Sequence, residues 1–325
     1  MTELSILDLV SVRDGGSAGE ALAETAGAAK AAEDAGYKRY WIAEHHGSEG
    51  LVGGATSLVI SHIGHATSTI RIGAGGIMLP NHNPFVIAEQ FGTLDALFPG
   101  RIDLGLGRAP GADPRIGQAL RKDLMRTSED FPQDVVELRA RFAGYPPMPI
   151  TASPGAADVQ MWILGSSLFG ARLAAMLGLP YAFASHFAPA QLDQALQVYR
   201  EHFEPSEDCE KPHVMAAMTV ITAETDQEAH DLRTSQDQTF VAFRTGRPAR
   251  LAPPVPGYRE TLPPEARAML EHMGQASAVG SRETVRGAVN AFIERTRADE
   301  IIIGGSVYDQ EARKRSIAMT MEAMA

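Results

Sequence analysis

The amino-acid sequence predicts an α/β protein, specifically a TIM (β/α)8 barrel with insertions. Eight strand-like segments follow one another along the 325 residues, and a helical segment follows nearly every one of them. The rival fold, a doubly wound sheet, requires a glycine-rich turn after the first strand and an acidic residue about twenty positions later. The first turn, Asp14-Gly15-Gly16, lacks that spacing. We therefore predict one barrel domain over residues 1–325.

The predicted elements have recognisable ends. Ser17 and Glu20 have the spacing of a capping box at the start of the first helix, and Gly36 suits the position just beyond its end. Asn83 is expected to cap the helix after the third strand, with Pro84 at its first position. The eight predicted strands are residues 4–10, 39–43, a stretch from 70, a stretch from 102, 161–164, 181–184, 215–222 and 300–303.

Two neighbouring predicted strands carry few side chains on one face. In the strand from residue 102, apolar residues at 102, 104 and 106 share one face, whereas Asp103, Gly105 and Gly107 share the other. Gly75-Gly76 removes side chains from the preceding strand as well. Because a bulky group can approach a backbone without side chains, we predict a seat for a flat ligand here.

One segment interrupts the alternation of strands and helices. Residues 239–279 follow the seventh predicted strand and contain Arg244, Arg247, Arg250 and six prolines, Pro248 among them. A loop of this length inside a compact domain is either functional or disordered. We predict that this insertion is a mobile lid above the C-terminal end of the barrel.

Composition narrows the classes of partner. The chain has 29 basic and 40 acidic residues, a net charge of −11 and a pI near 5.4, which disfavours nucleic acids and anionic membrane surfaces. The single cysteine, Cys209, excludes a disulfide framework. The sequence shows neither a signal region nor an apolar run long enough to span a membrane. These features predict a cytoplasmic protein.

Two strand ends suit a phosphate group. In a TIM barrel the active site lies at the C-terminal ends of the strands. Gly165-Ser166-Ser167 leads into a helix there, and the N–H groups and dipole of a helix N-terminus favour an anion, although plain N-capping explains this turn alone. Arg108 ends a neighbouring strand, and its planar guanidinium can clamp a phosphate. Together these residues predict a phosphate site.

Histidines follow several predicted strands. If the second strand continued through His45 and His46, the two side chains would point to opposite faces, and only one would face the pocket. A pocket histidine suits general acid–base chemistry, and a hydrogen-bonded structural histidine is the alternative. His82 and His186 also follow strands, but the first strand lacks the paired histidines typical of metal-dependent barrel hydrolases. We predict no metal.

A set of motifs runs along almost the whole chain in one order. They are Glu44-His45-His46, Gly75-Gly76-Ile-Met-Leu-Pro80, Ala88-Glu89-Gln90 through Leu94-Asp95 to Gly100-Arg101, Gly105 to Arg108, and Val279-Gly280-Ser281. In this order they resemble the bacterial luciferase-like monooxygenases, and the generic bacterial branch rather than the light-emitting subunits. Gly107 replaces the cysteine that precedes the arginine in true luciferase, which argues against light emission and a long-chain aldehyde substrate.

The resemblance implies a barrel that binds reduced FMN. It implies a phosphate held by Arg108 and by Gly165, Ser166 and Ser167, and a flavin ring lying against a non-proline cis peptide or bulge at Gly75-Gly76. We add Ser185, at the end of the sixth strand, to these cofactor-binding residues. His45 matches the catalytic histidine of the family. The segment 239–279 matches its mobile loop.

We therefore predict a flavin-dependent monooxygenase that uses O2, and FMNH2 from a separate reductase, to oxygenate a small organic substrate. The alternatives are a deazaflavin-dependent hydride-transfer enzyme on the same barrel and a non-catalytic flavin-binding protein, with a metal-dependent hydrolase a distant third. The family resemblance also implies a homodimer, which we expect to pack through the helices after the second and third strands. Residues 55–67, rich in small and apolar side chains, suit such a contact.

Overall fold

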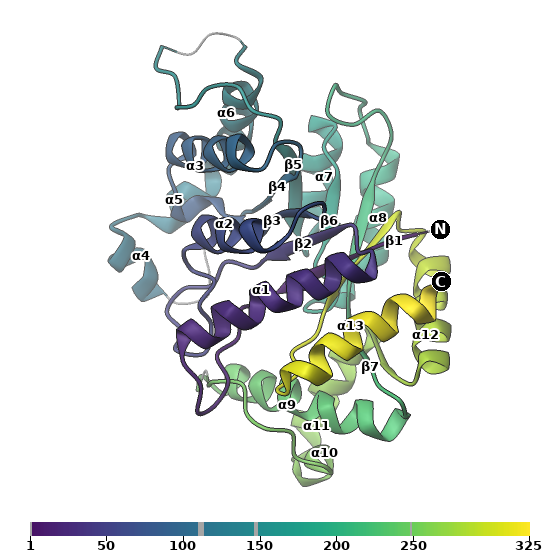
Figure 1. Ribbon diagram of the computed structural model, residues 1–325. Helices are drawn as coiled ribbons and strands as arrows, with labels where there is room; N and C mark the ends of the chain where they lie inside the picture. Colours follow the sequence, from purple (N-terminus) through teal and green to yellow (C-terminus); the bar gives the residue numbers. More distant parts are fainter. Residues whose placement is uncertain (1, 110–113, 146–148, 248) are drawn as a thin grey trace.

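The computed structural model describes residues 2–109, 114–145, 149–247 and 249–325, and within them a parallel sheet closes into a barrel (Figure 1). The strand order is β6-β5-β4-β3-β2-β1-β9-β7-β8, and an additional β6–β7 pairing closes a ring of eight strands. The predicted TIM barrel is thus confirmed. The strands are β1 (Glu3–Asp8), β2 (Arg39–Ile42), β3 (Arg71–Met78), β4 (Ile102–Gly107), β5 (Gln160–Gly165), β6 (Tyr181–Phe183), β7 (Val214–Thr222), β8 (Ser277–Gly280) and β9 (Glu300–Gly304).

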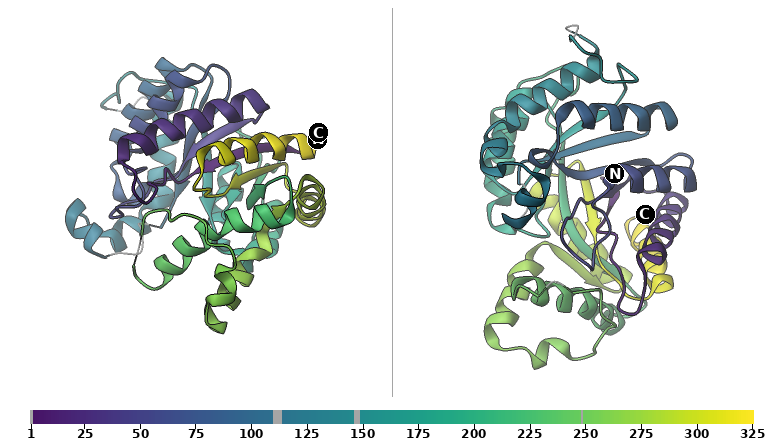
Figure 2. Two further views of the ribbon diagram at one scale, coloured as in Figure 1. Left: turned by 60° about the horizontal axis from the view of Figure 1, so that its bottom comes forward. Right: turned by 90° about the vertical axis from the view of Figure 1, so that its left-hand side faces the viewer.

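Helices cover the outside of the barrel, as the two views in Figure 2 show. Helix α1 packs against α13, α3 against α6, and α7 against α8. The helices are α1 (Ala18–Ala35), α2 (Thr56–Ala66), α3 (Pro84–Leu97), α4 (Pro114–Leu120), α5 (Leu124–Glu129), α6 (Phe131–Ala143), α7 (Leu168–Leu177), α8 (Leu192–Glu201), α9 (Asp226–Arg244), α10 (Tyr258–Thr261), α11 (Pro264–Met273), α12 (Arg282–Thr296) and α13 (Gln310–Met324), with short 3-10 turns η1 (Leu79–Asn81), η2 (Pro189–Gln191) and η3 (Gly274–Ala276).

The capping residues act as the sequence predicts. Ser17 and Glu20 form a complete capping box at α1, and Gly36 ends that helix in the left-handed conformation, with φ of 88°. The Asn83 side chain accepts a hydrogen bond from the N–H of Phe85 at the start of α3. These local signals therefore place the βα boundaries correctly.

The core has two layers. The larger layer lies between strands and helices, and it includes Ile102, Leu104 and Leu106 of β4 as predicted. The smaller layer fills the inside of the barrel and contains Trp41 and Trp162, whose rings meet edge to face with centroids 5.4 Å apart. The barrel is therefore a packed core rather than a pore.

The N-terminal end of the barrel is closed by buried charges. Arg39, at the start of β2, forms ion pairs of 2.8 Å with Asp103 of β4 and with Glu300 of β9. Arg71 pairs with the second carboxylate oxygen of Asp103 at 2.6 Å. Asp103 therefore shares the face of β4 with the glycines, as predicted, but it serves as part of this ionic base, which we call the basal network.

The segment 239–279 differs from the predicted loop. Residues 239–244 continue α9, and the segment then includes α10, α11 and strand β8, which pairs with β7 outside the closed ring. Pro264 is the first residue of α11, so this proline begins a helix rather than marking irregular chain. Pro248 lies outside the described residues. The lid role of the segment stays a prediction.

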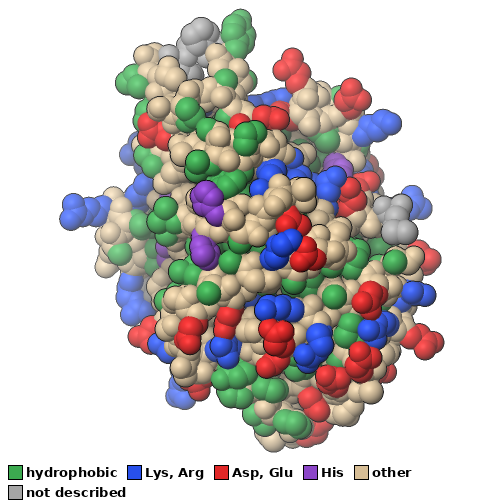
Figure 3. All heavy atoms as spheres, viewed as in Figure 1, with side chains coloured by type: hydrophobic (Ala, Val, Ile, Leu, Met, Phe, Trp, Pro, Cys, Tyr) green, Lys and Arg blue, Asp and Glu red, His purple; other side chains and the backbone are tan. Residues whose placement is uncertain are grey.

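The face shown in Figure 3 mixes acidic and basic side chains, with hydrophobic ones scattered among them. None of the helices in the described ranges combines the length and apolar character that a membrane crossing requires.

Candidate active site

The parallel barrel brings the predicted strand ends to one end of the molecule. All pairings among the described strands are parallel, so the segments that leave their C-terminal ends share one mouth. Glu44, His45 and His46 follow β2, His82 follows β3 and η1, and Arg108 follows β4. His186 follows β6 at the same end.

The Gly75-Gly76 peptide is cis, and the register with β4 shifts between Gly75 and Ile77. Both the predicted cis peptide and the predicted irregular pairing are therefore confirmed. A Cβ atom on Gly75 would lie 2.8 Å from Trp41 and Leu7, and one on Gly76 would lie 2.6 Å from the carbonyl oxygen of Gly105. Only glycine fits at either position without displacing its neighbours.

Arg108 lies beside the N-terminus of α7. Its guanidinium carbon is 4.0 Å from the ring centroid of Phe169, the second residue of that helix. Ser167 is the N-cap residue, but its side chain makes no capping hydrogen bond. A Cβ atom on Gly165 would meet nothing within 4 Å. The turn thus combines a helix N-terminus, a half-buried Ser166, open space and a nearby cation, which suits an anion.

Ser185 has a structural contact that the sequence does not reveal. Its side chain is fully buried, and its hydroxyl donates a 2.6 Å hydrogen bond to the carbonyl oxygen of Ala217 on β7. This bond fastens the end of β6 to β7. The Ser185 hydroxyl hydrogen is therefore already used within the protein, and a cofactor-binding role for Ser185 stays a prediction.

His45 and His186 form a pair of neutral imidazoles. Burial lowers the pKa of His45, and burial together with His45 lowers the pKa of His186 to about 4. The Nδ1 atoms of both rings are buried and have no hydrogen-bond partner among the described residues. These two nitrogen atoms are therefore buried polar atoms whose hydrogen-bonding capacity is unused within the described residues.

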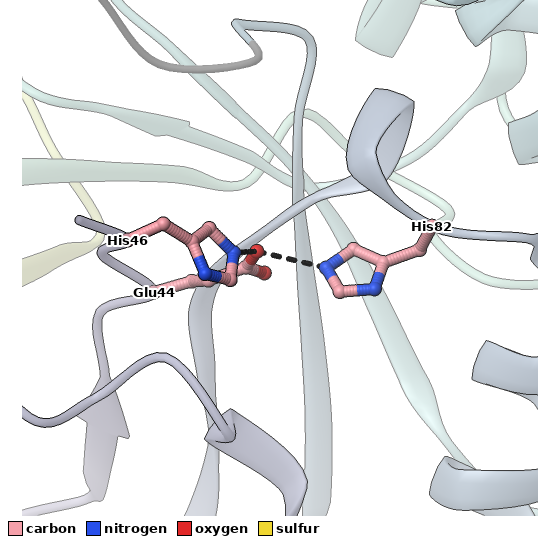
Figure 4. Close-up of side chains that lie close together, drawn as sticks. All are labelled: Glu44, His46 and His82. Atoms are coloured by element: carbon pink, nitrogen blue, oxygen red, sulfur yellow. Dashed lines mark hydrogen bonds and ion pairs between the residues drawn. The ribbon is translucent and has the colours of Figure 1, made fainter. Parts of the chain in front are cut away.

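Two further histidines lie within hydrogen-bond distance of the buried carboxylate of Glu44 (Figure 4). Glu44 Oε1 lies 2.5 Å from Nε2 of His46 and 2.8 Å from Nε2 of His82, and Glu44 Oε2 accepts a 3.0 Å bond from the N–H of Met78. Burial alone would raise the pKa of Glu44, but these contacts lower it overall. The hydrogen bond to Glu44 raises the pKa of His46.

The Glu44–His46–His82 cluster was not predicted from the sequence. A strand continuing through His45 and His46 would have allowed only one of these two side chains to face the pocket. Because β2 ends at Ile42, that alternation does not apply to the residues that follow. The only available signal was the recurrence of acidic and histidine residues just after two neighbouring strands.

The cluster contains side-chain types that bind divalent metals, and its three nearest ligand atoms lie within 4.8 Å of one another. However, both imidazole nitrogens converge on one carboxylate oxygen at hydrogen-bond distances, and the backbone occupies the other oxygen. The geometry is that of a hydrogen-bonded network.

Comparisons with known proteins agree with this architecture. The family model described as luciferase-like monooxygenase matches residues 2–300. A luciferase-like monooxygenase of Escherichia coli K12 is 44% identical over 320 residues, which cover 98% of this chain and 96% of the relative. An N-acetyl-S-alkylcysteine monooxygenase of Bacillus subtilis is 32% identical over 286 residues, covering 84% and 80%.

Solved structures give the same result. The crystal structure of apo-MsnO8 has a TM-score of 0.87 and 32% identity, covering 99% of this chain and 98% of that one. The fold is shared with an FMN complex of a type II Baeyer–Villiger monooxygenase of Pseudomonas putida, with a TM-score of 0.73 and 19% identity over 100% and 98% of the chains. It is also shared with an F420-dependent secondary alcohol dehydrogenase, with a TM-score of 0.69 and 16% identity over 100% and 99%. The chain belongs to the luciferase-like monooxygenase family.

Proposed function

We propose that this protein is a flavin-dependent monooxygenase that uses O2, and FMNH2 made by a separate reductase, to oxygenate a small organic substrate. The observation that carries the proposal is the position of Arg108 beside the N-terminus of α7, next to the glycine-lined ends of β3 and β4. The first feature suits the FMN phosphate, and the second suits the flat ring.

The residues of this chain have separate tasks in the proposed site. Arg108, Gly165, Ser166 and Ser167 would hold the phosphate, and Gly75-Gly76 would lie against the ring. Reduced flavin supplies the electrons that activate O2. The unpartnered Nδ1 atoms of His45 and His186 would orient the bound groups by hydrogen bonds, and the buried walls of the mouth would exclude water.

A deazaflavin is the alternative cofactor, because the fold is shared with an F420-dependent enzyme and a Cβ on Gly165 would meet open space on the phosphate side. Such a cofactor would support hydride transfer rather than oxygenation. A third alternative is a protein that binds flavin without catalysis.

One anaerobic experiment separates these three functions. The protein is titrated with FMNH2 and with reduced F420, and the complex that forms is then exposed to O2 together with candidate substrates, with N-acetyl-S-alkylcysteines first. We expect FMNH2 to bind more tightly and oxygenated product to form. Preferential binding of F420 would favour the hydride-transfer enzyme, and tight FMN binding without product from a wide substrate panel would favour the binding protein.

The assembly and location of the enzyme also belong to this proposal. We propose a cytoplasmic homodimer, in which α2 and α3 cover each other across the interface. Leu58 on α2 and Leu97 on α3 are large apolar side chains that are 71% and 52% exposed in the single chain. Light scattering at micromolar concentrations should give the mass of a dimer, and Leu58→Lys should shift it toward the monomer.

A further inference from the structure

The carboxylate of Glu44 determines which nitrogen atoms of its two histidines can exchange a proton. An ionised carboxylate only accepts hydrogen bonds, so the Nε2 atoms of His46 and His82 must each carry a hydrogen that points at Glu44 Oε1. The Nδ1 atoms, on the opposite edges of the rings, are then the positions that gain or lose a proton (Figure 4). Both rings are locked in the same tautomer by one oxygen atom.

The charged carboxylate of Glu44 is more deeply buried than the two imidazoles that exchange the proton. The Glu44 side chain is 0% exposed, whereas the side chains of His46 and His82 are 22% and 26% exposed. A Cβ atom at Gly54 would lie 3.4 Å from His46 Nδ1, which is van der Waals contact. Because Gly54 has no side chain, it leaves this nitrogen atom uncovered on that side. Protons can therefore reach the imidazoles while the carboxylate stays inaccessible.

Charge balance sets the number of protons. One added proton makes the cluster neutral, which relieves the cost of a buried anion. A second proton would place two cations on one carboxylate, and their repulsion opposes it. We propose that Glu44, His46 and His82 form a single unit that stores one exchangeable proton at the mouth of the barrel. In the reaction proposed above, the unit would give this proton from a histidine Nδ1 to the oxygen atom of O2 that leaves as water, and would regain a proton from solvent, which takes up the proton that the reduced flavin releases on oxidation.

The titratable groups around the Glu44–His46–His82 unit differ from it in charge or burial. His45, beside it, is held neutral by burial, and so is His186. On the other side Lys122 donates to the backbone carbonyl of His82, and Lys122 faces Asp134, whose pKa burial raises to about 6. The Lys122 ammonium limits how many further protons the unit accepts. Glu44 acts here as a positioning residue, because it works through the two histidines.

Histidine NMR tests the unit without any cofactor. In protein labelled with 15N at histidine, we expect both His46 and His82 to keep hydrogen on Nε2, while His46 gains and loses its proton at Nδ1. Glu44→Gln removes the negative charge that favours protonation, so the His46 midpoint should fall by about one pH unit or more. The signals of His230, which is exposed on α9, serve as the internal control and should be the same in the native protein and in Glu44→Gln. A native protein in which Nε2 lacks hydrogen, or an unmoved midpoint in Glu44→Gln, would overturn the unit.

Glutamine substitutions test the supply of the proton. The side-chain amide of His46→Gln or His82→Gln can still donate a hydrogen bond to Glu44, but it does not take up or release a proton near neutral pH. We expect each single variant to lose less than about tenfold in oxygenation rate, because the other histidine still holds the proton. The double variant should lose about 100-fold or more, and more of the consumed O2 should appear as H2O2. Equal, additive losses accompanied by weaker FMN binding would show a structural role instead.

The pH profile links the two measurements. Oxygenation in the native protein should decline as the pH rises above the His46 midpoint, and in Glu44→Gln the decline should move to lower pH by the shift seen by NMR. A profile that does not follow the NMR shift would contradict the supply of the proton. This inference rests on the proposed function, but the NMR titration does not, so a protein that never oxygenates with FMNH2 would refute that function separately.

Metal binding is the competing outcome. Co2+ or Zn2+ is added to chelator-treated protein, because a bound metal would replace the Nε2 hydrogens and remove their signals. We expect weak binding that Glu44→Gln does not change. Tight stoichiometric binding in the native protein, lost in Glu44→Gln, would show that the three residues form a metal site and would overturn the proposal.

Discussion

The two ends of the barrel bury carboxylates in opposite ways. At the N-terminal end, Asp103 and Glu300 pair with Arg39, and all three side chains are at most 3% exposed. At the C-terminal end, Glu44 is equally buried, and its hydrogen-bond partners among the described residues are two histidines and a backbone N–H. Arginine stays charged at any ordinary pH, whereas histidine changes charge near neutrality. One end therefore holds a fixed charge and the other a titratable one.

This difference separates stability from chemistry. Burial alone would lower the pKa of Arg39, but Asp103 and Glu300 raise it overall, so the basal network keeps its charges whenever the protein is folded. The mouth instead holds histidines whose pKa values shift in opposite directions, lowered by burial at His45 and His186 and raised by Glu44 at His46. In TIM barrels generally, the N-terminal face serves stability and the C-terminal face serves catalysis. The following substitutions test whether the same division holds here.

The largest effect should come from breaking the basal network. Arg39→Met leaves Glu300 buried without its arginine and leaves Asp103 with Arg71 as its remaining ion-pair partner. Removing one partner of a buried ion pair typically costs about 3–5 kcal/mol in the free energy of unfolding. Urea unfolding measures this loss. Arg282→Met is the matched control, because Arg282 pairs with Glu224 and Glu322 on the surface, where ion pairs contribute little to stability. Similar losses in the two variants would contradict the stabilising role of the base.

At the mouth, His45→Ala should damage the chemistry and spare the fold. Loss of a positioned acid–base or hydrogen-bonding group typically lowers the rate by about 100- to 10,000-fold. We expect oxygenated product to fall by this factor while FMN binding and thermal stability stay close to native, with reduced flavin yielding H2O2 instead. Single-turnover oxidation of the FMNH2 complex, with product and peroxide measured together, checks this. A variant that still couples O2 to the substrate would make His45 structural.

The next effect concerns cofactor affinity alone. Arg108→Ala removes the cation beside the N-terminus of α7, and FMN binding should weaken by about 1.5–3 kcal/mol, the value of a hydrogen bond to a charged group. Arg172→Ala removes the same charge from an exposed position on the same helix and should leave affinity nearly native. Anaerobic fluorescence titration measures both. Unchanged binding in Arg108→Ala would mean that the phosphate site is elsewhere.

The smallest effect is a pH dependence of stability that arises from His186 at the mouth of the barrel. The pKa of His186 is about 4 in the folded protein and near 6.5 when unfolded, so the unfolded chain binds the extra proton. Stability should therefore be complete well above pH 6.5 and fall by about 2 kcal/mol by pH 5.

Unfolding curves at pH 7 and pH 5 test this sign. His186→Gln should reduce the loss of stability between the two values, because glutamine does not titrate. Arg282→Met should leave that loss unchanged, since no titrating group is removed. An unaltered pH dependence in His186→Gln would show that other groups control it.

Much of the fold follows from local patterns in the sequence. The βα alternation, the Ser17 capping box and the Asn83 cap are each determined by a few adjacent residues, because caps and turns depend on local chemistry. The cis peptide at Gly75-Gly76 was instead predicted from the family resemblance, and the close contacts around it come from other strands. The closeness of Arg108 and α7 also followed from a general rule, since parallel strands deliver their C-terminal ends to one face.

Other features depended on contacts between distant parts of the chain. The sequence marks Arg39, Asp103 and Glu300 as ordinary charged residues, and only the closed ring brings strands β2, β4 and β9 near enough for their side chains to pair. The same holds for the bond from Ser185 to Ala217, which depends on the β6–β7 closure. The Glu44–His46–His82 cluster exists because β2 ends at Ile42 and η1 turns His82 back toward Glu44. Two of the partners of Glu44, Met78 and His82, lie 34 or more residues away in the sequence. Local propensity does not encode such contacts, so tertiary packing decides the path of the chain after β2.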